Sequence, residues 1–324
     1  MLSQAAQNWQ HDDRCYNKLV ELLHKGTYKK TEAGLSVDFR KIVDTKLSDE
    51  SLQTEYDKKI VHYGLHYMKS VNSLTDFKQK AVNYMKSVRE FHKKVNPERT
   101  AKEALDPLYG FISMQMRPYD PSKPQETFEL AQGVEDALGY PLLFIMHTNA
   151  ERPFEDSAMC VLGGTPLAVP AACKMPSLTD YLKLIKTFKF KHESNTAATF
   201  DVALMSFDVQ EDIKPDSKLT SLSGTTDEAG IRSRHELCEA SNYPTLLPVD
   251  DVLKVEAQAK EKKVVVYDSE STWKTKLEKF NQQSTGPHLG HAVFYLEYAS
   301  QDCDGEQTHP QLKKFQELTG IRRK

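Results

Sequence analysis

Apolar residues recur every three or four positions through much of the first hundred residues, separated by charged side chains. The rhythm is clearest from Ile60 to Phe91, where lysines fill many of the intervening positions. Such spacing is typical of amphipathic helices that turn one apolar stripe toward a core. The pattern therefore predicts a helical N-terminal region over residues 1–100, with its last helix ending near Asn96–Pro97.

Beyond residue 100 the apolar runs are shorter, and glycine and proline separate them. Helices are expected at residues 127–138, 177–190, 225–240 and 272–281, and strands at 109–116, 141–147, 200–209, 262–267 and 291–299. Residues 101–324 should therefore form a mixed α/β domain, so that the fold class is α+β with a helical N-terminal part. We expect Ser177 to cap the second of these helices.

The last three elements form a strand–helix–strand unit. We expect the strands at 262–267 and 291–299 in one sheet, because such units favour parallel pairing of neighbouring strands. The intervening helix should pack on that sheet through Trp273, Leu277 and Phe280, which lie on one helical stripe.

Charge and cysteine content narrow the functional classes. The chain has 324 residues, with 43 basic and 46 acidic side chains and a net charge of −3, so no basic field draws it to nucleic acid. No apolar run approaches the length of roughly 18 residues that a membrane span requires. The five cysteines include no closely spaced pair, which predicts free thiols in a reducing compartment.

The N-terminal segment lacks the apolar run of a secretory signal peptide. We therefore expect a cytoplasmic protein, or one secreted into a host cytosol without a cleaved signal peptide. Its oligomeric state is left open.

The segment SRHELCE, residues 233–239, carries the main candidate chemistry. On the expected helix, His235 and Glu239 share a face, and a carboxylate that orients an imidazole is a general-base unit. Arg232 and Arg234 could neutralise a phosphate beside it. Since each of these features is common on a helix surface, an ordinary surface His–Glu pair is the alternative.

This segment, with the strand KKVVVYDSES that follows, resembles a bacterial effector and toxin family marked by a serine and a downstream HxxxE. The resemblance implies AMP or related nucleotidyl transfer to a protein, with ATP as cofactor, Mg²⁺ as a further candidate and NAD as an alternative. It implies His235 and Glu239 as the catalytic pair, and Ser206 or Ser194 as the serine. It also implies a protein substrate or activator in a host cell, and no bound structural metal is expected.

Three other functions stay open. Cys160 or Cys173 with His291 would supply the thiolate and imidazole of a cysteine hydrolase. Arg117 would close a strand, where ADP-ribosyltransferases hold the phosphates of NAD. The third alternative is a non-enzymatic interaction protein whose lysine-rich helices bind an acidic surface.

Weaker patterns concern metals and phosphate. HELCE has the form of a degenerate zinc-peptidase helix, and His62 and His66 have the spacing of two ligands on one helical turn. Asp268–Thr272 joins a strand to a helix start, where Ser269 or Ser271 could act as the cap.

Overall fold

The computed structural model describes two sheets and several helices. It describes residues 33–38, 49–67, 74–97, 110–116, 125–148, 165–170, 176–209, 211–222, 224–239, 241–283 and 289–294, with a few positions within 17–25 and residues 315 and 317. Among these residues, no helix is long and apolar enough to cross a membrane.

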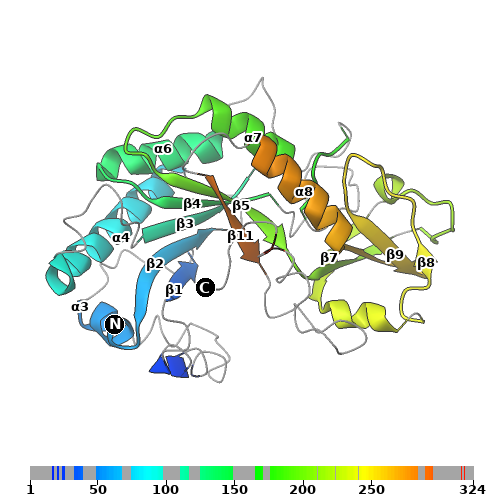
Figure 1. Ribbon diagram of the computed structural model, residues 1–324, viewed down its shortest axis with the longest axis horizontal. Coiled ribbons are helices and arrows are strands. Elements are labelled where there is room, and N and C mark those ends of the chain that lie inside the picture. The colour runs from blue at the N-terminus through cyan, green and yellow to red at the C-terminus, as the bar shows by residue number, and fades with distance from the viewer. Residues whose placement is uncertain are drawn as a thin grey trace. The chain divides into compact units, whose positions relative to one another are not determined.

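A six-stranded sheet has the order β1-β2-β3-β4-β5-β11 (Figure 1). Its strands are β1 (Ala33–Asp38), β2 (Ile60–Tyr67), β3 (Gly110–Gln115), β4 (Leu143–His147), β5 (Asn195–Asp201) and β11 (Leu289–Phe294). The pairs β1–β2 and β2–β3 are parallel. The helices that alternate with the strands are α3 (Asp49–Asp57), α4 (Leu74–Val95), α6 (Glu126–Leu138), α7 (Leu178–Thr187) and α8 (Glu270–Gln283). Strands alternating with helices in this way define an α/β fold.

The predicted helical N-terminal part is therefore wrong. Helix α4 confirms the rhythm after residue 74 and buries Phe77, Met85 and Phe91. The earlier apolar positions belong instead to β2, and β1 precedes it. In β2 the aromatic and β-branched residues fit a pleated, half-buried strand, a preference that a three-to-four-residue rhythm conceals over so short a run.

A second sheet has the order β7-β6-β10-β9-β8, and each of its four neighbouring strand pairs is antiparallel. Its strands are β6 (Leu204–Val209), β7 (Gly224–Arg232), β8 (Thr245–Leu246), β9 (Glu256–Lys260) and β10 (Lys263–Tyr267). Two short 3₁₀ helices, η2 (Leu219–Ser221) and η3 (Arg234–Cys238), lie between them. One face of this sheet buries an apolar cluster that includes Phe207, Leu253 and Val264.

Three further expectations about the last half of the chain are corrected. The helix expected at 225–240 is strand β7, in which Gly224 and Gly230 disfavour a helix. The strand expected at 200–209 is two strands, β5 and β6, separated by Val202 and Ala203. Finally, β10 and β11 lie in different sheets, so the expected strand–helix–strand pairing is wrong.

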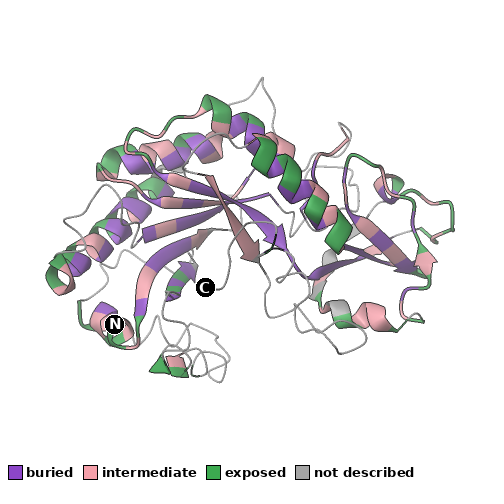
Figure 2. Ribbon diagram, in the orientation of Figure 1, coloured by how far each residue is buried: buried purple, intermediate pink, exposed green. Residues whose placement is uncertain are grey.

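Helix α8 itself matches its prediction. Trp273, Leu277 and Phe280 are all buried, and the ring of Phe280 stacks on Tyr181 of α7 at 5.9 Å between centroids. The predicted cap of α7 is confirmed as well, because Ser177 Oγ accepts a hydrogen bond from the Asp180 backbone N–H at 3.2 Å. Figure 2 shows the strands as mostly buried and the outer sides of the helices as exposed.

The chain divides into two compact units. Unit 1 comprises residues 1–114, 126–145 and 189–196, and unit 2 comprises residues 115–125, 146–188 and 197–324. In unit 1, α4 packs against α6, and in unit 2, α7 packs against α8.

Unit 1 contains a fully buried carboxylate, Glu135 of α6. It accepts backbone N–H hydrogen bonds from Lys191 at 2.8 Å, His192 at 3.2 Å and Ser194 at 3.1 Å, and one from Ser194 Oγ at 2.6 Å. Ser194 Oγ in turn accepts from the Leu142 N–H at 2.9 Å. The carboxylate thereby fixes the turn that leads into β5.

Candidate functional site

The residues that the sequence singled out are not arranged as expected. His235 and Glu239 are exposed, and they lie on the short η3 and at its C-cap rather than four apart on an α-helix. The His235 N–H donates to Ser233 Oγ at 3.3 Å, so this serine caps η3. The helical geometry that was to align the imidazole with the carboxylate is absent from this segment.

The other members of that predicted site lie on the small sheet or beside it. Ser206 is a buried residue of β6 whose Oγ donates to the Gly230 carbonyl at 3.2 Å. A Cβ at Gly230 would come within 2.9 Å of that Oγ, which explains the glycine. Arg232 ends β7 and is exposed, and Arg234 is in η3. Ser194, the alternative serine, is engaged with Glu135.

Two of the cysteine-hydrolase candidates, Cys160 and Cys173, lie outside the described residues, and so does Arg117. His291 is on β11, packed among Phe200, Phe280 and Phe315, with ring centroids 4.7–5.6 Å away. Burial lowers the pKa of His291 to about 4. The residue is half-buried, and its Nε2 has no hydrogen-bond partner within the part of the chain that the structure describes, so the ring packs as a neutral group.

Cys238 forms a disulfide, so the expectation of five free thiols is wrong. The other four cysteines are outside the described residues. Sequence separation could not reveal this bond, because cysteines far apart in the chain can meet in the fold.

In the part of the chain that the structure describes, no cluster of three His, Cys, Asp or Glu side chains could hold a metal ion. His62 and His66 are both on strand β2. Four strand residues span about 13 Å, whereas a helical turn would have brought the two rings close together.

The cap predicted at the start of α8 is confirmed in geometry, with Thr272 N–H donating to Ser269 Oγ at 3.4 Å.

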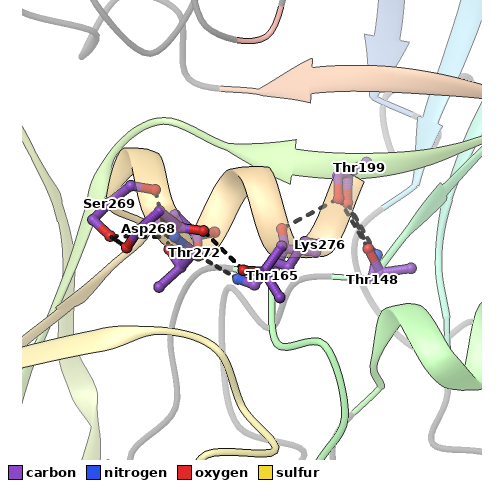
Figure 3. A network of polar contacts seen from close by, with 9 residues as sticks. Thr148, Thr165, Thr199, Asp268, Ser269, Thr272 and Lys276 are labelled. Carbon is purple, nitrogen blue, oxygen red and sulfur yellow. Dashed lines mark hydrogen bonds and ion pairs between the residues drawn. The ribbon is translucent and has the colours of Figure 1, made fainter. Parts of the chain in front are cut away.

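What the fold brings together in unit 2 is a buried polar cluster around the end of β5 (Figure 3). Thr148, directly after β4, donates two hydrogen bonds to Thr199: its N–H to Thr199 Oγ1 at 3.0 Å and its Oγ1 to the Thr199 carbonyl at 3.0 Å. Thr165 Oγ1 donates to the same carbonyl at 3.2 Å. All three threonines are completely buried.

The charged half of the cluster centres on Lys276 of α8. Its ammonium is completely buried and forms an ion pair with Asp268, which also accepts a hydrogen bond from Thr272 Oγ1 at 3.1 Å. Burial lowers the pKa of Lys276, while the negative charges of Asp268 and Asp201 act in the opposite direction. Asp201, the last residue of β5, is itself 1% exposed.

This cluster defines what the described strand ends can do chemically. In parallel α/β folds, ligands bind at the carboxyl ends of the strands. Asp268 is engaged in an ion pair with Lys276, and the negative charge of Asp201 acts on the same lysine, so both carboxylates belong to a buried cluster. The cluster fixes the loops at these strand ends rather than supplying an acid.

Sequence reasoning named the segment Asp268–Thr272 only as a helix start and missed the other residues of this cluster, although signals were present. The apolar run 141–147 ends in His147 and Thr148, polar residues where a buried strand would end. Lys276 interrupts the apolar stripe of α8 beside Leu277, and a lysine at such a position needs a buried counter-charge.

The whole fold has close counterparts among solved structures. An immunomodulatory active chitinase from Trichuris suis matches with a TM-score of 0.65 and 13% identity, over 92% of this chain and 83% of that one. The human pseudo-chitinase YKL-39, described as retaining chitooligosaccharide binding, matches at 0.66 and 11%, over 94% and 86%. The fold is chitinase-like. A glycoside hydrolase family 18 N-acetylglucosaminidase from Paenibacillus barengoltzii matches at 0.62 and 13%, over 92% and 86%.

At these identities the likeness concerns the fold alone. No protein-family model matches the chain, and no curated protein does. The resemblance to the AMP-transferring effector family therefore stays a prediction from one motif.

The predicted nucleotidyl transferase function is wrong, as are its transferase and nucleotide-binding attributes. The fold belongs with chitinases and chitinase-like proteins, which are hydrolases or glycan-binding proteins by their descriptions. The physical cause of the error is local: HxxxE was placed on a helix, and the chain forms β7 and η3 there.

Proposed function

We propose that this protein binds chitooligosaccharides and does not cleave them. The observation that carries the proposal is the chitinase-like fold, which extends over more than nine-tenths of the chain in the neighbours described above. One of those neighbours is described as a pseudo-chitinase that retains chitooligosaccharide binding.

The choice of binding over hydrolysis rests on the buried cluster. A glycosidase needs a carboxylic acid that can protonate the departing oxygen. Asp268, between β10 and α8, forms an ion pair with Lys276, and the negative charge of Asp201 at the end of β5 acts on the same lysine. Both carboxylates are buried, so neither is placed to protonate a bound glycan.

The test is calorimetric titration with chitohexaose, with cellohexaose as the matched ligand that lacks acetamido groups. We expect saturable heat with chitohexaose only, and an unchanged oligosaccharide by mass spectrometry after prolonged incubation. Absence of binding to chitohexaose would overturn the proposal as a whole. Cleavage by the wild type that Asp201→Asn abolishes would overturn its non-catalytic half.

We also propose that the protein acts in an oxidising compartment. Disulfides persist outside the cytosol and are rare within it, and Cys238 forms one. Alkylation of the denatured protein without reductant should modify at most three of the five cysteines, since one disulfide consumes two thiols. Five modified cysteines in protein isolated from its native source would contradict this placement.

A further inference from the structure

The parallel sheet of unit 1 has two unlike faces. A Cβ at Gly110 would lie 2.7 Å from Met85 Sδ of α4, so Gly110 faces that helix. Side chains alternate along a strand, so Ile112 and Met114 share this face, and they are 0% and 1% exposed. Phe111 and Ser113 must then point to the opposite face.

On that opposite face the ring of Phe111 lies flat against the neighbouring strand. A Cβ at Gly64 of β2 would meet three ring carbons of Phe111 at 2.4–2.5 Å, and a Cβ at Gly34 of β1 would meet a fourth at 3.3 Å. The ring therefore occupies the space that a side chain at Gly64 would fill, whereas a Cβ at Gly34 would first meet His62 Cβ at 2.8 Å and the His62 carbonyl oxygen at 3.0 Å. Phe111 lies across β2 toward β1 with its other side turned away from the sheet.

This surface is open compared with the helix-covered face. Gly34 and Ser36 of β1 are exposed, and Phe111 and His66 are partly exposed. Ser36 is in register with Gly64, the residue beneath the ring. One step nearer the carboxyl ends of the strands, His66 is in register with Ser113. An aromatic ring therefore forms a floor, with hydroxyl and imidazole groups beside it.

We propose that Phe111 is the stacking platform for one pyranose ring of a chitooligosaccharide, with Ser36 and His66 as its polar flank. The proposal rests on the proposed function and names where the glycan lies in unit 1. An N-acetylglucosamine ring has one face of polarised C–H groups and a rim of hydroxyl and amide groups. The electron-rich face of a phenyl ring attracts the former, and hydrogen-bonding side chains at its edge match the latter.

The groups around Phe111 suit an uncharged glycan. The platform is a hydrocarbon ring between two glycines, and its flanking groups are hydroxyl and imidazole. A neutral, ring-shaped ligand with an apolar face suits it better than a phosphate or an acidic peptide, which would need cationic side chains.

The central experiment compares Phe111→Leu with Phe77→Leu, the same substitution at a buried position of α4. In calorimetric titrations with chitohexaose, Phe111→Leu should weaken binding roughly tenfold, as loss of an aromatic contact does. Phe77→Leu should lower the melting temperature and leave the dissociation constant unchanged. Phe111→Tyr retains the ring and should bind as the wild type does.

A second variant leaves Phe111 and its packing unchanged. Ser36→Arg adds bulk at an exposed position opposite Gly64, so the protein should fold normally and bind chitohexaose at least tenfold more weakly. Wild-type affinity in both Phe111→Leu and Ser36→Arg would overturn the platform while leaving the proposed function intact. A wild type that does not bind chitohexaose would instead overturn the proposed function, and the platform with it.

Discussion

Two buried carboxylates, one in each unit, are stabilised by opposite means. Glu135 is surrounded by neutral donors, namely three backbone N–H groups and the Ser194 hydroxyl. Asp268 is ion-paired with Lys276, with Thr272 as its hydroxyl donor. Neutral dipoles stabilise a charge without creating a second one, whereas an ion pair buries two charges that each depend on the other.

The difference has a practical consequence for the two units. Around Glu135, the loss of one donor leaves the others in place. Around Asp268, the loss of Lys276 leaves the negative charges of Asp268 and Asp201 buried without their ammonium. We therefore expect unit 2 to be the more sensitive to a single substitution.

The largest effect is expected from Lys276→Met, which keeps the length of the side chain and removes its charge. The free energy of unfolding should fall by about 3–5 kcal/mol, the usual result of breaking a buried pair. Urea unfolding followed by circular dichroism measures it. Adding Asp268→Asn should restore part of the loss, and a double variant less stable than Lys276→Met would contradict the pairing.

Glu135→Gln tests the neutral arrangement. The glutamine oxygen can still accept three of the four hydrogen bonds, but its amide NH₂ then faces the Lys191 N–H, which is itself a donor. We expect a loss of about 1–3 kcal/mol in the same urea assay. A loss greater than that of Lys276→Met would reverse the comparison.

His291 is a half-buried titratable group whose Nε2 has no hydrogen-bond partner among the described residues. Its pKa of about 4 lies below the unfolded value of 6.5, so between these pH values the unfolded chain binds a proton that the folded chain does not. Stability should therefore fall as the pH drops through this window, by about 1–2 kcal/mol at about pH 5. Unfolding of the wild type and of His291→Leu at about pH 7.5 and about pH 5 measures the difference. An equal loss of stability in both proteins would show that His291 is not its cause.

The smallest effects are expected from removing the hydroxyl group that donates to each carboxylate, on Ser194 for Glu135 and on Thr272 for Asp268. Ser194→Ala removes the donor to Glu135 and also the acceptor of the Leu142 N–H, so it should cost about 1–2 kcal/mol. Thr272→Val removes a donor from a carboxylate that keeps its lysine, and should cost about 1 kcal/mol or less. Thr54→Val, at an exposed position of α3, is the control and should change little.

Much of the fold could be predicted where one period extended over a long element or a cap marked its end. Helices α4, α6, α7 and α8 fall into this class, and Gly139 follows α6 with a φ of 72°. The pairing of strands could not be predicted in this way. The apolar runs of β10 and β11 look alike, and only contacts distant in sequence place them in separate sheets.

The candidate site was less accessible to sequence reasoning than the fold. Ser206, His235 and Glu239 attracted attention because they carry reactive groups at a familiar spacing, yet that spacing had meaning only on a helix. Lys276 and Thr148 were overlooked, because a single polar residue beside an apolar run suggests burial without indicating its partner. Their role arises when β5, α8 and the residues beyond β4 meet, which no local window contains.

The two-residue step between β5 and β6 has a consequence for proteolysis. Val202 and Ala203 are 2% and 1% exposed, and on the return path Asp268, which follows β10, is 2% exposed. A protease must bind several residues of extended chain in its active site. The buried links between β5 and β6 and between β10 and α8 cannot supply them without unfolding. The small antiparallel sheet should therefore resist excision as a fragment, and a trypsin digest should cut its outer loops long before it separates the sheet from the rest of unit 2.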